Sequence, residues 1–467
     1  MDFFESSDEH REVMSKVTRF ESMLANQENY YFDCEEFQDI IEHYILRSDF
    51  DQAQNVVEYS LNLHPTSIDL KILKTQVLVG FSKYKEALEL IERIELYEPH
   101  NFDLILVKGT ILSKLKMSDR AIACFKRCLK SSEFIDEVYH FIASEYQRTQ
   151  EYGESIRYFK LCLQSNPENE AALYDLNMCF ECTNKHAEAI DFYTDLIDKA
   201  PYCEALWFNL AGAFSREEEW LKSVDCYDYA IAINPKFASA YFNKANALAS
   251  LEDFESAIEV YKESFEHEDP TFVTYTYVGE CYERLKKYEL GISYYKKAIS
   301  ENEDHAEAWL GVAICQDGLK LSNEAYASVT KAIELDNENP DFWYTASEIE
   351  ERLGYIDDSL VSMKKAVELD QEDLSLALDY LLLLDRYFSP SLVSDALAET
   401  IDKFSGSSAL LYFKTAFLLK QGKYQQAYQC FELALTIDYQ SHEKVFTYYP
   451  DAKDNQNLLE LIDLYRD

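Results

Sequence analysis

The side chains of this sequence that are best able to do chemistry belong to its 11 cysteines and 9 histidines. Such side chains bind metals and act as nucleophiles. Cys179 and Cys182 form a Cys-x-x-Cys motif, a spacing found in redox pairs and in zinc sites. A zinc site needs three or four converging ligands, and the sequence has no second Cys-x-x-Cys motif. The sequence therefore predicts no metal site, and it shows no signature of another cofactor.

Other catalytic signatures are also missing. The chain has 11 glycines, and it contains no phosphate-binding loop, dinucleotide fingerprint or nucleophile elbow. Its 86 acidic residues make any single pair of carboxylates uninformative. Four histidines fall at predicted turns, where exposure to water is their expected state; these are His64, His100, His186 and His305. We therefore expect that this protein is not an enzyme.

The elements that position these residues recur every 34 residues. Prolines mark the interval at Pro65, Pro99, Pro167, Pro201 and Pro235. Small residues keep the same interval at Ala53, Ala87, Ala121, Ser155, Ala189, Ser223, Ala257, Gly291, Ala325, Ser359 and Ala427. Twelve consecutive units of 34 residues therefore run from Cys34 to Ser441.

Each unit has the periodicity of two helices. We number the positions of a unit 1 to 34, with Cys34 at position 1 of the first unit. Large residues recur at position 4 and small ones at positions 8 and 27, whereas rings recur at positions 11 and 24. At about 100° per residue, positions 4, 8 and 11 share one face of a first helix, and positions 24 and 27 share one face of a second. The sequence therefore predicts an all-α fold in which rings pack beside small residues.

The cysteines follow the same repeat. Cys179, Cys281 and Cys315 all occupy position 10, and Cys128 and Cys162 share position 27. Recurrence at predicted core positions favours the use of cysteine as a small apolar side chain over a reactive thiol.

The net charge of −42 limits the classes of partner. It repels phosphate backbones and anionic membrane surfaces, so we expect no nucleic-acid partner. No run of about 18 apolar residues is present, so we expect no membrane insertion. The acidic N-terminus lacks the features of a secretion signal, and the predicted location is cytoplasmic. The charge favours solubility and, as a second interpretation, attracts basic or mixed-charge peptide segments.

The repeat resembles the tetratricopeptide-repeat (TPR) family, whose signature is W-x2-L-G-x2-Y, then A-x3-F, an Ala and a Pro. One unit carries this pattern as Trp207, Leu210, Ala211, Phe214, Ser223, Tyr227, Ala230 and Pro235. The whole chain is similar to long cytoplasmic TPR proteins of Bacteroidetes-type bacteria. The resemblance implies an all-α TPR α-solenoid, a right-handed superhelix of antiparallel helix pairs that binds other proteins.

Three segments are expected along the chain. Residues 1–33 are predicted as an N-terminal capping helix, 34–441 as twelve TPR units and 442–467 as a C-terminal capping helix. Caps are expected because a terminal repeat otherwise leaves its apolar face bare. The eleventh unit, 374–407, is divergent because Val393 replaces a small residue, and a local change of packing is expected there.

A candidate binding surface follows from the first helix of each unit. Positions 2, 5, 6, 9, 12 and 13 lie opposite the core positions, and the TPR resemblance implies that they line a concave groove. Units four to seven place rings at position 5 and amides around them. The predicted peptide-binding residues are His140, Tyr174, Met178, Phe208, Asn209, Arg216, Phe242, Asn243 and Asn246. Amides offer a donor and an acceptor to a peptide backbone, and rings supply area for anchors.

Several alternatives stay open at this point. The rings at position 5 either bind a ligand or only pack between neighbouring helices. An acidic end beyond them is suited to a basic peptide and contains Glu280, Glu283, Glu348 and Glu351. A carboxylate clamp of the kind found in chaperone-binding TPR domains is not expected, because Phe208 and Phe242 stand where its lysines would be. The predicted function is a non-catalytic scaffold or adaptor; the alternative is a permanent structural subunit of a larger enzyme or secretion complex. The oligomeric state is open.

Overall fold

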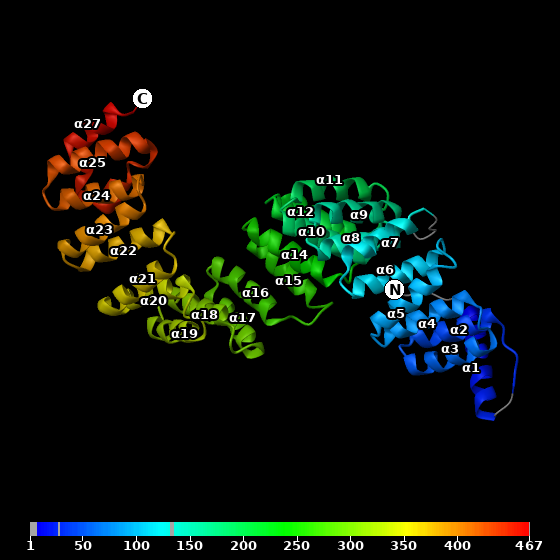
Figure 1. Ribbon diagram of the computed structural model, residues 1–467. Coiled ribbons are helices and arrows are strands. Elements are labelled where there is room, and N and C mark those ends of the chain that lie inside the picture. The colour runs from blue at the N-terminus through cyan, green and yellow to red at the C-terminus, as the bar shows by residue number, and fades with distance from the viewer. Residues whose placement is uncertain (1–6, 27–28, 131–134, 467) are drawn as a thin grey trace. The chain divides into compact units, whose positions relative to one another are not determined.

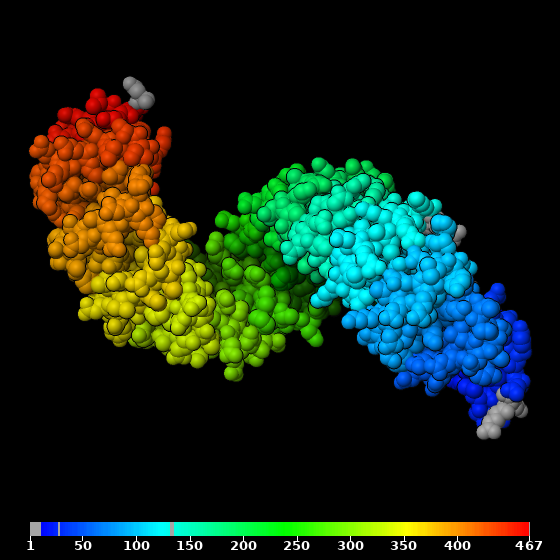
Figure 2. Space-filling view, viewed as in Figure 1, coloured from blue at the N-terminus to red at the C-terminus, as the bar shows by residue number. Residues whose placement is uncertain are grey.

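The computed structural model describes residues 7–26, 29–130 and 135–466. These residues form helices and turns, with no β-strand among them. The chain divides into two compact units, 1–247 and 248–467. Within each unit, consecutive helices lie side by side in chain order (Figure 1). Side chains fill the spaces between successive helices, so each unit has a continuous surface (Figure 2). The predicted all-α fold of stacked helix pairs is thus confirmed.

The first compact unit begins with α1 (Ser7–Asn26), which is followed by helix pairs. The pairs are α2 (Cys34–Leu46) with α3 (Phe50–Leu63), α4 (Ile68–Gly80) with α5 (Tyr84–Glu95), α6 (Phe102–Lys114) with α7 (Ser118–Cys128), α8 (Ile135–Arg148) with α9 (Tyr152–Ser165), α10 (Glu170–Thr183) with α11 (His186–Ile197), and α12 (Glu204–Arg216) with α13 (Trp220–Ile233). Most of the next helix, α14 (Ala238–Ser250), also belongs to this unit.

The second compact unit continues with α15 (Phe254–Ser264) and further pairs. These pairs are α16 (Phe272–Arg284) with α17 (Tyr288–Glu301), α18 (Ala306–Gly318) with α19 (Ser322–Leu335), α20 (Pro340–Leu353) with α21 (Ile356–Leu369), α22 (Leu374–Tyr387) with α23 (Pro390–Lys403), and α24 (Ser408–Lys420) with α25 (Tyr424–Ile437). The tail forms η1 (Tyr439–Ser441), α26 (Lys444–Tyr448), η2 (Pro450–Asp454) and α27 (Gln456–Leu464).

A capping side chain recurs before several of the first helices, at the same position of the repeat. Asp33, Ser67, Asn101 and Asn169 each accept a hydrogen bond from a backbone N–H in the first turn of the helix that follows. Such side chains satisfy backbone donors that have no partner within the helix. These caps therefore help to fix where the helix starts, although α12 and α18 start at the same position after Cys203 and His305, which make no such hydrogen bond.

The turn within a pair is made by one residue in the left-handed conformation, again at a fixed position. This residue has positive φ at Ser48, Ser82, Lys116, Gln150, Asn184, Glu218, Glu252, Lys286, Lys320, Gly354 and Gly422. Glycine is the usual residue for this conformation, because a Cβ atom makes it costly. Here most of the turns carry other residues, so the backbone geometry of the repeat is imposed against their local preference.

The pair α22 and α23 makes its turn differently. Phe388, at the position that elsewhere has positive φ, is extended with φ −117° and ψ 177°. Pro390 then occupies the first turn of α23, where its missing N–H costs nothing. This turn is the local departure of residues 374–407 from the other units.

In the core, aromatic rings pack directly against glycines of neighbouring helices. The ring of Phe125 on α7 lies so close to Gly109 on α6 that a Cβ atom there would be 2.4 Å from the ring. Tyr295 on α17 lies against Gly279 on α16 and Gly311 on α18, where a Cβ atom would be 2.9 Å and 2.2 Å from its ring. Close approach of helix backbones therefore depends on these glycines.

The two ends of the chain pack against the neighbouring pairs. Phe20 on α1 is buried and makes edge contacts with Phe32 and Phe37, with ring centroids 5.7 Å and 6.0 Å apart. Val445 and Leu458 of the tail belong to the same apolar cluster as Phe431 of α25. We propose that these end segments cap the array. Within the described ranges, no helix combines the length and apolarity required to cross a bilayer.

Candidate protein-binding surfaces

The predicted peptide-binding residues lie on α8, α10, α12 and α14, the first helices of four consecutive pairs. Helix α10 contacts both α8 and α12, so its residues occupy the middle of this surface. We call this surface, with the nine residues predicted above, the ring surface. All of it lies within the first compact unit.

Tyr174 and Met178, both on α10, are the exposed apolar residues of the ring surface. Tyr174 is 72% exposed and Met178 is 50% exposed. The Met178 Sδ atom lies 3.6 Å from Nε2 of Gln147 on α8. A large ring and a flexible thioether, one helical turn apart and open to water, can contact a partner without unfolding anything.

His140 is used inside the protein. Its Nε2 atom lies 3.3 Å from Oδ2 of Asp175 on the neighbouring helix α10. The imidazole also packs edge-on against Phe159, with ring centroids 5.5 Å apart. These contacts connect α8 to α10 and to α9. His140 therefore helps to hold the helices of the ring surface together.

Phe208 is also engaged by its own repeat. Its ring contacts Tyr227 and Phe237, with centroid distances of 5.7 Å and 4.9 Å. Phe242, at the equivalent position of the next unit, is half-buried. Packing within the repeat therefore explains, at least in part, why the chain has an aromatic residue at Phe208.

The polar residues of the ring surface are partly engaged. The Nδ2 atom of Asn209 donates to the carbonyl of Ala205 at 2.8 Å, which leaves its carbonyl oxygen as an acceptor. Arg216 forms an ion pair with Glu181 on α10, with a closest distance of 3.0 Å. Asn243 and Asn246 are half-buried on α14. Because Arg216 already has an acidic partner, it adds little net positive charge to the surface.

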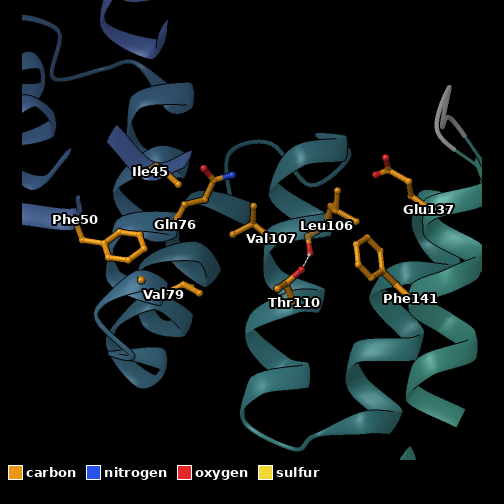
Figure 3. Close-up of a pocket in the computed structure, with 10 residues that line it drawn as sticks. Ile45, Phe50, Gln76, Val79, Leu106, Val107, Thr110, Glu137 and Phe141 are labelled. Carbon is orange, nitrogen blue, oxygen red and sulfur yellow. Dashed lines mark hydrogen bonds between the residues drawn. The ribbon is translucent and has the colours of Figure 1, made fainter. Parts of the chain in front are cut away.

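A second group of residues, most of them at the outward positions of units one to four, was not among the predicted binding residues. A cavity of about 440 Å³ is lined by Ile45, Phe50, Gln76, Val79, Gly80, Leu106, Val107, Thr110, Glu137 and Phe141. We call it the aliphatic groove. Figure 3 shows Phe50 and Val79 on one side of it and Glu137 and Phe141 on the other, with α6 between them. Aliphatic residues at positions that should face outward, such as Ile45 and Val79 at position 12, were the signal that could have revealed it.

The acidic end of the second compact unit is more constrained than expected. Glu283 accepts a hydrogen bond from the hydroxyl of Tyr295 at 2.8 Å, and Glu351 pairs with Arg386. Burial, followed by repulsion from Asp379 and Glu351, raises the pKa of Glu348. Glu283, Glu348 and Glu351 therefore already interact with other side chains of the protein.

Ion pairs connect successive first helices in this unit. Each pair joins an acid at position 12 of one repeat to a base at position 13 of the next, 35 residues later. They are Asp317 with Arg352, Glu351 with Arg386, and Asp385 with Lys420. Their acidic side chains are 12–24% exposed. We refer to this series as the ion-pair ladder; Glu181 with Arg216 follows the same rule in the first unit.

One buried carboxyl leads to a testable pH dependence. Glu350 on α20 is 6% exposed, and its Oε2 atom has no hydrogen-bond partner in the described structure. Burial raises its pKa above 4.5. Because the folded protein then binds this proton more tightly than the unfolded chain, the stability it gives is present at low pH and is lost as the pH rises through the folded pKa.

We therefore expect Glu350→Gln to stabilise the second compact unit at pH 8, by roughly 1 kcal/mol, the order of one unsatisfied buried acceptor. The gain over the wild type should shrink as the pH is lowered from 8, because the wild-type carboxyl then becomes protonated. Urea unfolding over a series of pH values measures this. The exposed Glu372→Gln change is the control and should show no pH-dependent difference. A gain that stays constant down to the ordinary range of a carboxyl would contradict the assignment.

The cysteines and histidines that the structure describes bear on the question of metal binding. Within the described residues, no three His, Cys, Asp or Glu side chains are placed to hold a metal ion. Cys179 is fully buried, with its thiol 3.4 Å from the hydroxyl of Ser155, and burial raises the pKa of Cys162 to about 12. These thiols are held protonated in the core. The expected exposure was wrong for His305, which is only 16% exposed and whose Nε2 lies 3.0 Å from the Thr276 hydroxyl.

Comparison with known proteins agrees with this architecture. A tetratricopeptide-repeat family model matches residues 226–259, and a second model of the same repeat matches 102–134, 136–169 and 274–305. No curated protein matches the sequence.

Among solved structures, the chain has matches at low sequence identity. YrrB, described as a TPR protein with an unusual peptide-binding site, is 21% identical, with 40% of this chain and 96% of YrrB covered and a TM-score of 0.34. The APC/C hetero-tetramer Cut9–Hcn1 is 11% identical, covering 90% of this chain and 94% of that chain, with a TM-score of 0.41. MamA from Desulfovibrio magneticus RS-1 is 16% identical, covering 37% and 97%, with a TM-score of 0.34.

Three of the matched segments each correspond to one helix pair: α6 with α7, α8 with α9, and α16 with α17. The fourth, 226–259, contains α14 with the end of α13 and the start of α15. All four segments match models of the same repeat, and the helix pairs have the length that is typical of this family. The family of the chain follows from these matches. This chain is a tetratricopeptide-repeat protein.

Proposed function

We propose that this protein is a non-catalytic scaffold or adaptor that binds a peptide or helix of a partner protein on the ring surface. The observation that carries the proposal is the exposure of Tyr174 and Met178 on α10, because large apolar side chains at the middle of a surface are typical binding hot spots. The net charge of −42 favours a basic or mixed-charge partner segment and disfavours nucleic acid. The proposed location is the cytoplasm.

A photo-crosslinking experiment tests the proposal. A benzophenone amino acid in place of Tyr174 should give a discrete crosslinked partner in cells of the native host. The same amino acid in place of Tyr202, which is 84% exposed but lies outside the ring surface, is the matched control and should not. Equal crosslinking from both positions, or none from Tyr174, would contradict the proposal.

We expect Tyr174→Ala combined with Met178→Ala to weaken binding of that partner by roughly 2–3 kcal/mol, the sum of two modest hot spots. Because both side chains are exposed, the circular dichroism spectrum and the unfolding midpoint should not change. Isothermal titration calorimetry with the purified partner measures the affinity. A loss of stability together with binding would instead assign these residues to the core.

The second candidate function is a permanent structural subunit of a larger enzyme or secretion complex. The ion-pair ladder favours a fixed arrangement of the last repeats, as such a subunit needs. Ionic strength separates the two functions. A charge-steered adaptor loses association rate steeply as salt is added, whereas a permanent apolar interface does not.

A further inference from the structure

The hydroxyl group of Tyr193 on α11 is buried without a partner. The Tyr193 side chain is fully buried, and its hydroxyl oxygen has no hydrogen-bond partner in the described structure. Such groups are rare in folded proteins, because a polar group that loses water and gains no partner destabilises the fold. The repeat itself supplies a comparison, since another unit has a tyrosine at the same position.

The equivalent tyrosine of the eighth unit does have a partner. Tyr193 and Tyr295 both occupy position 24, and the hydroxyl of Tyr295 donates to Glu283 at 2.8 Å. Glu283 occupies position 12, which is 12 residues before this tyrosine. In the fifth unit, position 12 is Glu181, at the same separation from Tyr193. A carboxylate at position 12 can therefore reach the hydroxyl at position 24.

The backbone follows the same course in the two units. Asn184 and Lys286, both at position 15, make the turn in the left-handed conformation, with φ angles of 52° and 58°. Helices α11 and α17 then both begin two residues later. In agreement with this equivalence, burial and, after it, repulsion from Glu181 raise the pKa of the Tyr193 hydroxyl. The fifth unit thus has the geometry for the same hydrogen bond but does not make it.

Glu181 has a different partner because the next unit offers it a base. Its two carboxylate oxygens lie 3.1 Å and 3.0 Å from Nε of Arg216, which is 35 residues further along the chain, on α12. The residue at the same distance from Glu283 is Gly318, which has no side chain to pair. In the three repeats of the ion-pair ladder, position 24 is valine, methionine or leucine. Glu181 is therefore the one acid at position 12 to which the sequence offers both a base and a tyrosine.

The balance between these two partners of Glu181 is close. The side chain of Glu181 is 35% exposed and that of Arg216 is 61% exposed, whereas the acids of the ladder are 12–24% exposed. An ion pair this open to water contributes little to stability, and Arg216 is well hydrated without it. A bond to Tyr193 would satisfy a buried hydroxyl, but the carboxylate would have to give up water to reach it. Neither arrangement has a large advantage.

We propose that Glu181 is a two-position switch within the array. In the first position, which the structure shows, Glu181 pairs with Arg216 and holds α10 to α12. In the second, it accepts a hydrogen bond from Tyr193, as Glu283 does from Tyr295, and α12 loses its ion pair to α10. Both α10 and α12 contribute to the ring surface, so the switch lets this surface adjust to a bound partner at little cost in stability. Only this last step rests on the proposed function.

A change of sign tests the switch without any partner. Hydrogen exchange of α10, α11 and α12 in the full chain measures their local opening. In the otherwise unaltered protein, Tyr193→Phe removes a hydroxyl that has no partner and should slow exchange about fivefold. In the Arg216→Gln variant, Glu181 bonds this hydroxyl, so the same Tyr193→Phe change should speed exchange about fivefold. An effect of the same sign with and without Arg216 would overturn the proposal.

The ion-pair ladder supplies a matched control. Arg352→Gln removes the base that pairs with Asp317, and position 24 of that repeat is Val329, which cannot replace it. This change should speed exchange of α18 and α20 about threefold. Arg216→Gln should change the exchange of α10 and α12 less than about twofold, because Tyr193 takes the carboxylate. A larger effect of Arg216→Gln than of Arg352→Gln would contradict the switch.

A crystal structure of the Arg216→Gln variant shows the second position directly. The Glu181 carboxylate should lie about 2.7–2.8 Å from the Tyr193 hydroxyl, and a carboxylate that remains in solvent would overturn the proposal.

The link to the ring surface is tested separately. Tyr193→Phe leaves Glu181 no alternative to Arg216, so it should lower the yield of the partner crosslinked from the benzophenone in place of Tyr174 about threefold. An unchanged yield would overturn the coupling of the switch to the ring surface. Absence of any crosslink in the otherwise unaltered protein would instead contradict the proposed function, on which the change of sign does not depend.

Discussion

Replacing Tyr295 by alanine should destabilise the second compact unit by about 3–5 kcal/mol, the range for removal of a large buried ring. The side chain is 3% exposed and fills the space between Gly279 and Gly311. Because these neighbours have no side chains that could move into the cavity, we expect a value in the upper half of the range. Urea unfolding, with hydrogen exchange to locate the loss in α16, α17 and α18, measures the effect.

Two further variants distinguish the contribution of the Tyr295 ring from those of its hydroxyl and of the neighbouring ring. Tyr295→Phe keeps the ring and removes only the 2.8 Å hydrogen bond to Glu283, so it should cost about 0.5–1.5 kcal/mol. Tyr294→Ala removes an adjacent ring that is only half-buried and should cost less than Tyr295→Ala. If Tyr294→Ala were the more damaging change, the ring of Tyr295 would not be the element that holds the pairs together.

Glycine at four turns should raise the stability of the first compact unit by about 2–4 kcal/mol in total. The positions are Ser48, Lys116, Gln150 and Glu218, whose φ angles lie between 58° and 62°. A non-glycine residue pays a conformational cost for positive φ in the folded protein, and glycine removes that cost. This gain exceeds the entropy that glycine adds to the unfolded chain, so we expect a net stabilisation of about 0.5–1 kcal/mol at each turn. The turns are far apart, so their effects should add. The denaturant midpoint of each single variant and of the combined variant measures this.

The reciprocal change is the control. Gly354, at the same position of its repeat, has φ +82°, and Gly354→Ala should destabilise by about 1 kcal/mol. A neutral Gly354→Ala, or a combined glycine variant no more stable than the wild type, would show that the turn geometry carries no strain.

The helix pairs could be predicted because their signal is repeated. Each unit restates the spacing of rings and small residues, so an exception such as Val393 does not hide the period. The turns could not be predicted in the same detail. Lys116 and Glu218 carry no local preference for positive φ; the hydrogen bonds and packing of the flanking helices impose it. Residue type alone therefore did not identify the turn position.

The binding surfaces were less predictable because one position of the repeat meets different neighbours. Tyr174 and Phe208 both occupy position 5, yet Tyr174 is exposed whereas Phe208 packs against Phe237. The sequence shows both as outward rings, since a helical wheel contains no information on the adjacent pair. The aliphatic groove escaped notice for the same reason: Ile45 and Val79 become a cavity wall only when four pairs are stacked.

The ion-pair ladder has a consequence for how the array can change in length. Each acid is separated from its base by one repeat plus one residue, as in Asp317 with Arg352 and Asp385 with Lys420. Excision of a whole 34-residue repeat from this region would place the acid of one ion pair opposite the base of another. The two side chains would still have opposite charges. Partners along the ladder are thus interchangeable, so gene-level duplication or loss of modules can occur here without an electrostatic mismatch at the new junction.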